Sequence, residues 1–216
     1  MRYTNGVTMT IDYSLYLVAD IASAIGRDLP ALVASAVEGG VTVVQLRSKA
    51  LPLRDFLELA SWIKGPLDKA GVPLLINDRA DVALACEAAG VHLGQDDLPV
   101  PEARRILGAE RVIGVSVNTL EEALDAERAG ADYVGLGPVF PTSTKETRLA
   151  VVGPEGVARL KAALAIPVVA IGGITAANAP SLARAGADGI AVVSAILGAV
   201  DARRAARELR EAFAGR

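Results

Sequence analysis

Residues 40–44 read Gly40-Val41-Thr42-Val43-Val44, in which a glycine that can end a helix leads into residues typical of a strand. The same pattern recurs along the chain, and other apolar runs of strand length lie between its copies. Together they predict eight strands, at Leu15–Val18, Val41–Val44, Val72–Ile76, Val91–Leu93, Arg111–Val115, Ala131–Val134, Ile166–Ile171 and Ala187–Val192.

The stretches between these runs have helical periodicity, as in Phe56, Ala60, Ile63 and Leu67. Most of the predicted strands are continuously apolar, which is typical of a parallel sheet covered on both faces. Eight strand and helix pairs in about 200 residues predict an α/β fold, a (β/α)8 TIM barrel, with residues 1–216 as one domain. An open doubly wound sheet is the alternative. Within the second helix, Gly65-Pro66 predicts a kink or a break.

Composition excludes several classes of protein. The chain has 216 residues, 52% of them hydrophobic and 22% charged, which suits a compact domain. The net charge of −3 and the absence of a basic stripe argue against nucleic acid as a partner. No apolar run reaches the roughly 18 residues that span a bilayer, so no membrane association is expected. The single cysteine, Cys86, cannot form an internal disulfide, and a cytoplasmic location is expected.

Active sites of such barrels form at the carboxyl ends of the strands. After the second strand, alternation sends Gln45, Arg47 and Lys49 to the same side. Two cations beside an amide suit a multiply charged anion such as diphosphate. The alternative for this triplet is an ordinary solvated loop.

The next two strand ends carry acidic side chains. One reads Asn77-Asp78-Arg79, and the other ends in Gln95-Asp96-Asp97. Neighbouring strands lie about 4.8 Å apart, so carboxylates from these ends can meet at one Mg²⁺ ion that also binds substrate phosphate. Spacing leaves open whether Asp96 or Asp97 takes part. The alternative is that Asp78 and Asp97 cap the helices that follow.

Further polar groups follow the remaining strands. The only histidine, His92, lies within a strand among apolar neighbours, which favours a structural role, and Ser116 and Asn118 end the fifth strand. The sixth strand leads into an irregular segment that runs to about Gly153, includes Thr142, Ser143, Thr144 and Lys145, and is predicted to be a mobile lid. The last two strands end in Gly172-Gly173-Ile174 and Val192-Val193-Ser194, which predict a monophosphate site.

Taken in order, these motifs resemble the thiamine phosphate synthase family. They are Gln45-x-Arg47-x-Lys49, Asn77-Asp78-Arg79, His92-Leu93-Gly94-Gln95-Asp96-Asp97, Gly137-Pro138-x-Phe140-x-Thr142-x-Thr144-Lys145 and Gly172-Gly173-Ile174. The resemblance covers nearly the whole chain. It implies a Mg²⁺-dependent transferase that couples hydroxymethylpyrimidine diphosphate with a thiazole phosphate, giving thiamine monophosphate and diphosphate.

The same resemblance assigns roles to residues. It implies that the pyrimidine diphosphate binds Gln45, Arg47, Lys49 and Asn77, with Ser116 and Lys145 also on the diphosphate. It places Mg²⁺ on Asp78 and Asp97. The thiazole phosphate is expected at Thr142, Thr144, Gly173, Val193 and Ser194. Arg47, Lys49, Ser116 and Lys145 are the expected catalytic residues, the partners are these small molecules, and a homo-oligomer is left open.

Two other barrel proteins are alternatives. Thiazole tautomerases share the monophosphate site but depart from the basic triplet and the metal aspartates, and they tend to have histidine in place of Asn118. A non-catalytic phosphate-binding barrel would have no evident use for either group. The presence of the basic triplet with the aspartates, and of Asn118 in place of histidine, favours the synthase over the tautomerases.

Overall fold

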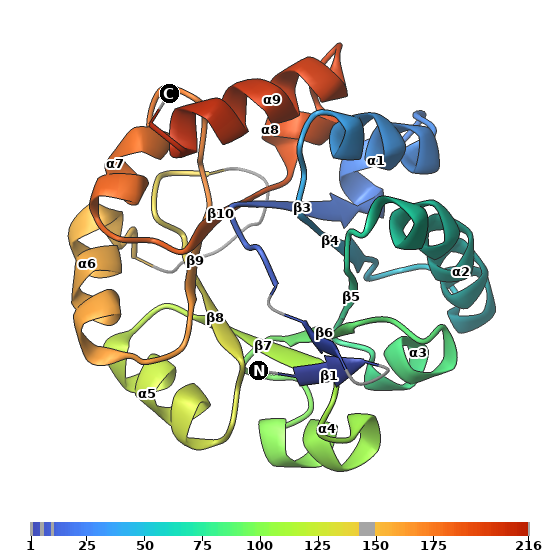
Figure 1. The fold of residues 1–216 in the computed structure, drawn as a ribbon, viewed down its shortest axis with the longest axis horizontal. Helices are drawn as coiled ribbons and strands as arrows, with labels where there is room; N and C mark the ends of the chain where they lie inside the picture. Colours follow the sequence, from blue (N-terminus) through green and yellow to red (C-terminus); the bar gives the residue numbers. More distant parts are fainter. Residues whose placement is uncertain (1, 5–6, 10, 143–149, 216) are drawn as a thin grey trace.

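A computed structural model describes residues 2–4, 7–9, 11–142 and 150–215. Within these residues, eight parallel strands close into a barrel in the order β10-β3-β4-β5-β6-β7-β8-β9 (Figure 1). The strands are β3 (Leu15–Asp20), β4 (Val43–Arg47), β5 (Leu74–Asn77), β6 (Gly90–Leu93), β7 (Val112–Val117), β8 (Tyr133–Leu136), β9 (Val168–Ile171) and β10 (Gly189–Val192). The predicted (β/α)8 fold is confirmed, and the open doubly wound sheet is excluded.

Helices surround this barrel and alternate with its strands (Figure 1). Side-chain caps begin several of them, since Asp28 accepts from the Ala31 N–H and Thr119 forms a capping box with Glu122. The helices are α1 (Leu29–Glu38), α2 (Leu53–Ala70), α3 (Ala80–Ala85), α4 (Val100–Leu107), α5 (Leu120–Arg128), α6 (Gly153–Ala163), α7 (Ala179–Arg184), α8 (Ser194–Leu197) and α9 (Ala202–Phe213), with a 3-10 turn η1 (Ile21–Ala24) after β3.

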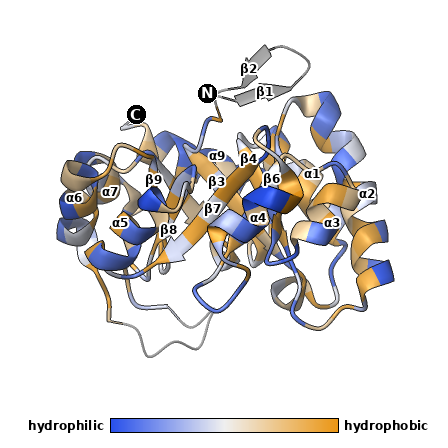
Figure 2. Ribbon diagram, turned by 90° about the horizontal axis from the view of Figure 1, so that it is seen from below, coloured by the Kyte–Doolittle hydropathy of each residue, from blue (hydrophilic) through white to orange (hydrophobic). Residues whose placement is uncertain are grey.

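The core has two layers. A large apolar shell lies between the strands and the helices, and Figure 2 shows mainly hydrophobic strands surrounded by helices of mixed hydropathy. A smaller cluster fills the barrel interior and includes Tyr13, Tyr16, Leu75, Tyr133 and Val169. A filled interior closes the barrel below its carboxyl end, so that ligands can enter only above these side chains.

Helix α2 differs from the expectation at Gly65-Pro66. The helix runs from Leu53 to Ala70 with Pro66 inside it, so a break is excluded, and the alternative, a kink, stays a prediction. Proline removes one helical N–H, whose acceptor would be the carbonyl of Trp62 four residues earlier. Trp62 is 68% exposed, so water can satisfy that carbonyl while the apolar face of the helix stays packed on the barrel.

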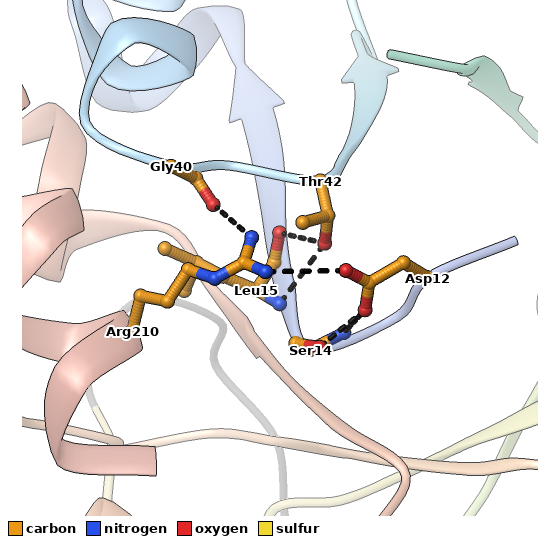
Figure 3. A network of polar contacts seen from close by, with 6 residues as sticks. All are labelled: Asp12, Ser14, Leu15, Gly40, Thr42 and Arg210. Atoms are coloured by element: carbon orange, nitrogen blue, oxygen red, sulfur yellow. Dashed lines mark hydrogen bonds and ion pairs between the residues drawn. The ribbon is translucent and has the colours of Figure 1, made fainter. Parts of the chain in front are cut away.

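One arginine of the last helix links α9 to the segments that precede β3 and β4. Arg210 donates to the carbonyl of Gly40 at 2.8 Å and pairs with Asp12 at 3.3 Å (Figure 3). Beside it, the Thr42 hydroxyl accepts from the Leu15 N–H at 3.1 Å and donates to the Leu15 carbonyl at 3.0 Å. These contacts tie α9 and the start of β4 to the first barrel strand.

A short hairpin precedes the barrel. Strands β1 (Arg2–Thr4) and β2 (Val7–Met9) form a separate antiparallel sheet, which the apolar patterning did not predict. That residues 1–216 are one domain stays a prediction. In the part of the chain that the structure describes, no helix has the length and apolar character to cross a membrane.

Candidate active site

A cavity of about 540 Å³ opens at the carboxyl ends of the barrel strands. Side chains from the ends of the strands and backbone of the loops that follow them make its wall. The predicted site residues that line it are Gln45, Arg47, Lys49, Asn77, Asp97, Ser116, Thr142, Gly173, Val193 and Ser194. The fold therefore brings segments from distant parts of the sequence to one place.

The basic triplet lies along β4 and the loop after it. Gln45 is buried, Arg47 is partly buried and Lys49 is exposed, so the three side chains rise from the floor of the cavity to its rim. Arg47 Nη1 lies 3.1 Å from Oδ1 of Asp20, which is buried at the end of β3. The contact is an ion pair without an aligned hydrogen bond, since Asp20 Oδ1 has no hydrogen-bond partner among the described residues. The negative charge of Asp20 attracts the guanidinium of Arg47 to this part of the wall.

Asn77 ends β5 within the same wall and is only 7% exposed. Its Nδ2 has no hydrogen-bond partner among the described residues. A buried amide N–H is normally paired, so this unpaired group in a residue that lines the cavity marks Asn77 as a candidate for binding a ligand.

Asp78 and Asp97 meet at the rim. Asp97 lines the cavity, whereas Asp78 lies just outside the lining, where it contacts Asp97 and pairs with Lys49. Asp78 has a φ of 63°, a left-handed conformation that is uncommon for residues other than glycine and often marks functional positions. The capping alternative is wrong, because the N-cap positions of α3 and α4 are Arg79 and Pro99 and neither helix has a side-chain cap.

The two carboxylates interact unfavourably when both are ionised. Burial raises the pKa of Asp78, and the neighbouring Asp97 raises it further against the opposing effect of Lys49. Burial would also raise the pKa of Asp97, but hydrogen bonds with Asp78 and the Gly94 N–H outweigh burial and lower it. A divalent cation between them would allow both groups to ionise.

The two carboxylates suit a magnesium ion that also binds water and substrate, and do not suit a metal site made of protein ligands alone. Among the described residues, no group of three or more His, Cys, Asp or Glu side chains is arranged to hold a metal. Mg²⁺ commonly takes one or two carboxylates and completes its shell with water and substrate phosphate oxygens. Asp78 and Asp97 beside an open cavity match that requirement.

A polar chain forms the floor of the cavity. His92 Nε2 lies 2.8 Å from Ser116 Oγ, and His92 Nδ1 lies 2.8 Å from the hydroxyl of Tyr133. Ser116 therefore sits at the cavity wall with its hydroxyl in contact with a buried imidazole. His92, expected to be structural, lines the cavity itself.

Glycines shape the opposite wall, where the loops after β9 and β10 face the cavity. Gly173 has a φ of 64°, and a Cβ there would lie 2.4 Å from the carbonyl oxygen of Pro141. Only glycine fits this close approach to the loop after β8. Val193 and Ser194 line the same wall at the start of α8.

Part of the expected site falls outside the described residues. Thr142 lines the cavity, but Ser143, Thr144 and Lys145 lie in the stretch 143–149, outside the described residues. The lid predicted for this segment stays a prediction.

Sequence reasoning missed several residues of the cavity wall. They are Tyr16, Asp20 and Tyr133, together with the role of His92 as a lining residue. Tyr16, Val18 and Asp20 alternate along β3, so the period-two pattern that identified the Gln45 triplet could have found Asp20. The tyrosines carried no such signal, because they lie inside strands that read as ordinary core.

Comparisons with known proteins agree on one family. A family model described as thiamine monophosphate synthase matches residues 15–196. A thiamine-phosphate synthase from Syntrophomonas wolfei is 52% identical over 93% of this chain and 96% of its own length. One from Chloroflexus aurantiacus is 50% identical over 93% and 92%. The solved thiamine phosphate pyrophosphorylase from Pyrococcus furiosus is 40% identical, with a TM-score of 0.87 over 95% of this chain and 97% of its own.

Proposed function

Since this chain belongs to the thiamine monophosphate synthase family and is a transferase, we propose the two substrates that it joins. They are 4-amino-2-methyl-5-hydroxymethylpyrimidine diphosphate and a thiazole phosphate. The products are thiamine monophosphate and diphosphate.

One observation carries this proposal, namely that a single cavity has two walls whose groups suit different phosphates. One wall has Arg47, Lys49 and Asp97, and Asp78 contacts Asp97 just outside it, which together suit a diphosphate with its metal. The facing wall has the close-packed glycine turn at Gly173 and the start of α8, which suit a monophosphate. Two phosphorylated substrates can therefore lie with their reacting ends between the walls.

In the proposed reaction, the bond between the pyrimidine methylene carbon and the diphosphate oxygen breaks first. Both electrons leave with the diphosphate, and the thiazole nitrogen then donates its lone pair to the resulting carbocation. Arg47 and Lys49 stabilise the charge that grows on the departing group, and Asp20 holds Arg47 in place. Ser116 donates to the same diphosphate, and Asn77 Nδ2 binds the pyrimidine substrate.

When Mg²⁺ is bound at Asp78 and Asp97, it supplies neutralisation of negative charge on the diphosphate. Every other part of this scheme needs only positioning and fixed charge, so no side chain has to act as a covalent nucleophile or general base.

The direct test mixes the purified protein with both phosphorylated substrates and Mg²⁺, and measures thiamine monophosphate and released diphosphate. Equal amounts of both products are expected, and omission of either substrate or addition of a chelator should abolish them. Isomerisation of a thiazole phosphate alone would identify a tautomerase instead. Binding without turnover would identify a phosphate-binding barrel, and either result would overturn the proposal.

The matched variant is Arg47→Ala, with Arg54→Ala on α2 as its control. Loss of one preorganised cation should lower kcat by about 100-fold, or about 3 kcal/mol of transition-state stabilisation. Arg54 belongs to the exposed first turn of α2, and its variant should keep normal turnover. Normal turnover by Arg47→Ala would remove this residue from the scheme.

A further inference from the structure

A continuous chain of hydrogen bonds crosses the barrel beneath the cavity. Gln45 Nε2 donates to the Tyr16 hydroxyl at 2.7 Å, and the Tyr16 and Tyr133 hydroxyls lie 2.9 Å apart. Tyr133 contacts His92 Nδ1 at 2.8 Å, and His92 Nε2 contacts Ser116 Oγ at 2.8 Å. The chain thus joins one wall of the cavity to the other through the middle of the core.

The strands are built to allow this chain. In the register of the sheet, Gly114 lies directly between His92 on β6 and Tyr133 on β8. A Cβ on Gly114 would lie 2.1 Å from the Tyr133 ring, and one on Gly135 would lie 3.0 Å from the His92 ring. Two glycines therefore leave the space in which the phenol reaches the imidazole.

One hydrogen bond of this network has a fixed direction, because the Tyr16 oxygen accepts from the Gln45 amide. Either hydroxyl can donate in the bond between Tyr16 and Tyr133, but the bond from Gln45 favours a Tyr16 proton that is directed to Tyr133. In that arrangement Tyr133 donates to Nδ1 of His92, and Nδ1 is an acceptor. Burial raises the pKa of both phenols, so each keeps the proton that it donates.

We propose that Tyr16 and Tyr133 are positioning residues that hold His92 with its single proton on Nε2, so that Ser116 accepts from the imidazole. The hydroxyl proton of Ser116 is then left to point into the cavity. If the hydrogen bonds ran in the opposite direction, Ser116 would donate to His92, and its oxygen would offer only lone pairs to a ligand in the cavity. An anionic diphosphate requires a hydrogen-bond donor, so the direction of these hydrogen bonds decides whether Ser116 can bind it.

This inference rests on the proposed function in one respect, namely that the ligand of the Ser116 hydroxyl is the diphosphate of the substrate. The position of the proton on His92 is a property of the protein without substrate. The two can therefore fail separately. A protein that makes no thiamine monophosphate refutes the proposed function and leaves the proton position to be measured.

His92 is the only histidine in the chain, so untagged protein labelled with ¹⁵N-histidine gives the spectrum of one imidazole. A spectrum that correlates ring nitrogens with carbon-bound ring protons distinguishes Nδ1 from Nε2, and the nitrogen shifts report which is protonated. At pH 7 without ligand, a protonated Nε2 and an unprotonated Nδ1 are expected. A protonated Nδ1, alone or together with Nε2, would overturn the proposal.

The variant Tyr133→Phe removes one hydroxyl and keeps the ring. Its spectrum should lose the single Nε2-protonated form in favour of a mixture, and kcat should fall about 10- to 100-fold. Because Ser116 acts on charge that grows during bond breaking, KM should change less than kcat.

The control is Val43→Ala, a change in the same interior cluster that removes methyl groups and no polar atom. It should lower stability while leaving the His92 spectrum and kcat unchanged. An unchanged spectrum in Tyr133→Phe, or an equal loss of kcat in Val43→Ala, would refute the positioning role. The wild-type spectrum decides the proton position even where a variant fails to fold.

Discussion

Asp96 and Asp97 are adjacent in sequence but differ in what they touch. Both line the cavity, but Asp97 contacts Asp78 and accepts from the Gly94 N–H at 2.7 Å, whereas Asp96 is exposed. Geometry thus favours Asp97 as the partner of Asp78, in line with what the resemblance implied. Spacing alone could not separate the two residues, because they are adjacent and follow the same strand, which ends at Leu93.

The pair offers a matched test of the proposed metal site. Asp97→Asn should raise the Mg²⁺ concentration needed for half-maximal activity by about tenfold or more, since an amide is a poorer ligand for Mg²⁺ than a carboxylate. Asp96→Asn removes the same charge one residue away and should leave this concentration nearly unchanged. Titration of activity with Mg²⁺ measures this concentration for each variant. A larger effect in Asp96→Asn would show that Asp96, and not Asp97, binds the metal.

The basic triplet could be identified from the sequence because its pattern is local. Gln45, Arg47 and Lys49 are polar at every second position where the strand runs into its loop, so alternation alone places them together. Tyr16, His92 and Tyr133 are contacts between strands far apart in sequence. Their alignment depends on the register of the whole barrel, which a local pattern does not contain.

The strands are anchored at their starts by side chains of the preceding loops. Asp132 Oδ2 accepts from the Ile113 N–H and from Arg104, each at 2.7 Å. Asp188 Oδ2 does the same for the Val168 N–H at 2.6 Å and Lys161 at 2.7 Å. Such anchors fix where a strand begins, and so which of its residues reach the cavity at the other end.

Asp132→Ala should therefore destabilise the protein by about 1–3 kcal/mol, because the partly buried Ile113 N–H loses its charged acceptor. The control is Asp125→Ala, which removes an exposed pair with Arg128 on α5 and should change stability by about 0.5 kcal/mol or less. Urea unfolding measures both free energies. Equal effects of the two variants would show that the anchor contributes no more than a surface ion pair.

Element types were easier to predict than their irregularities. All eight strands overlap the predicted runs, five of which follow a helix-ending glycine, because a continuously apolar run between helices has few other ways to be buried. Pro66 does not break α2, because the packing of the helix on the barrel outweighs the low helix propensity of proline. The strands of the hairpin β1–β2 have only three residues each, which is too short for a reliable strand pattern.

The contact between Arg210 and Asp12 makes the stability of the barrel depend on pH. Partial burial would raise the pKa of Asp12, but hydrogen bonds from Ser14 and the charge of Arg210 outweigh burial and lower it. A lowered carboxyl pKa adds stability above the unfolded value of about 4, and this stability is lost as pH falls through the folded value.

Asp12→Asn should consequently be less stable than wild type at neutral pH, and the difference should shrink as the pH falls below about 4. Urea unfolding between about pH 3 and pH 7 measures the difference. A gap that stays constant across this range would mean that the ionised carboxylate of Asp12 does not contribute.

The contact between Arg210 and Asp12 also places the two extremities of the barrel fold next to each other in space. A short linker could join residue 214 to residue 11, with new termini opened in the exposed turn at Gly71. Such a circular permutant should still bind both phosphorylated substrates. The order in which the strands of a closed barrel are connected does not change which residues lie at the carboxyl end of the barrel.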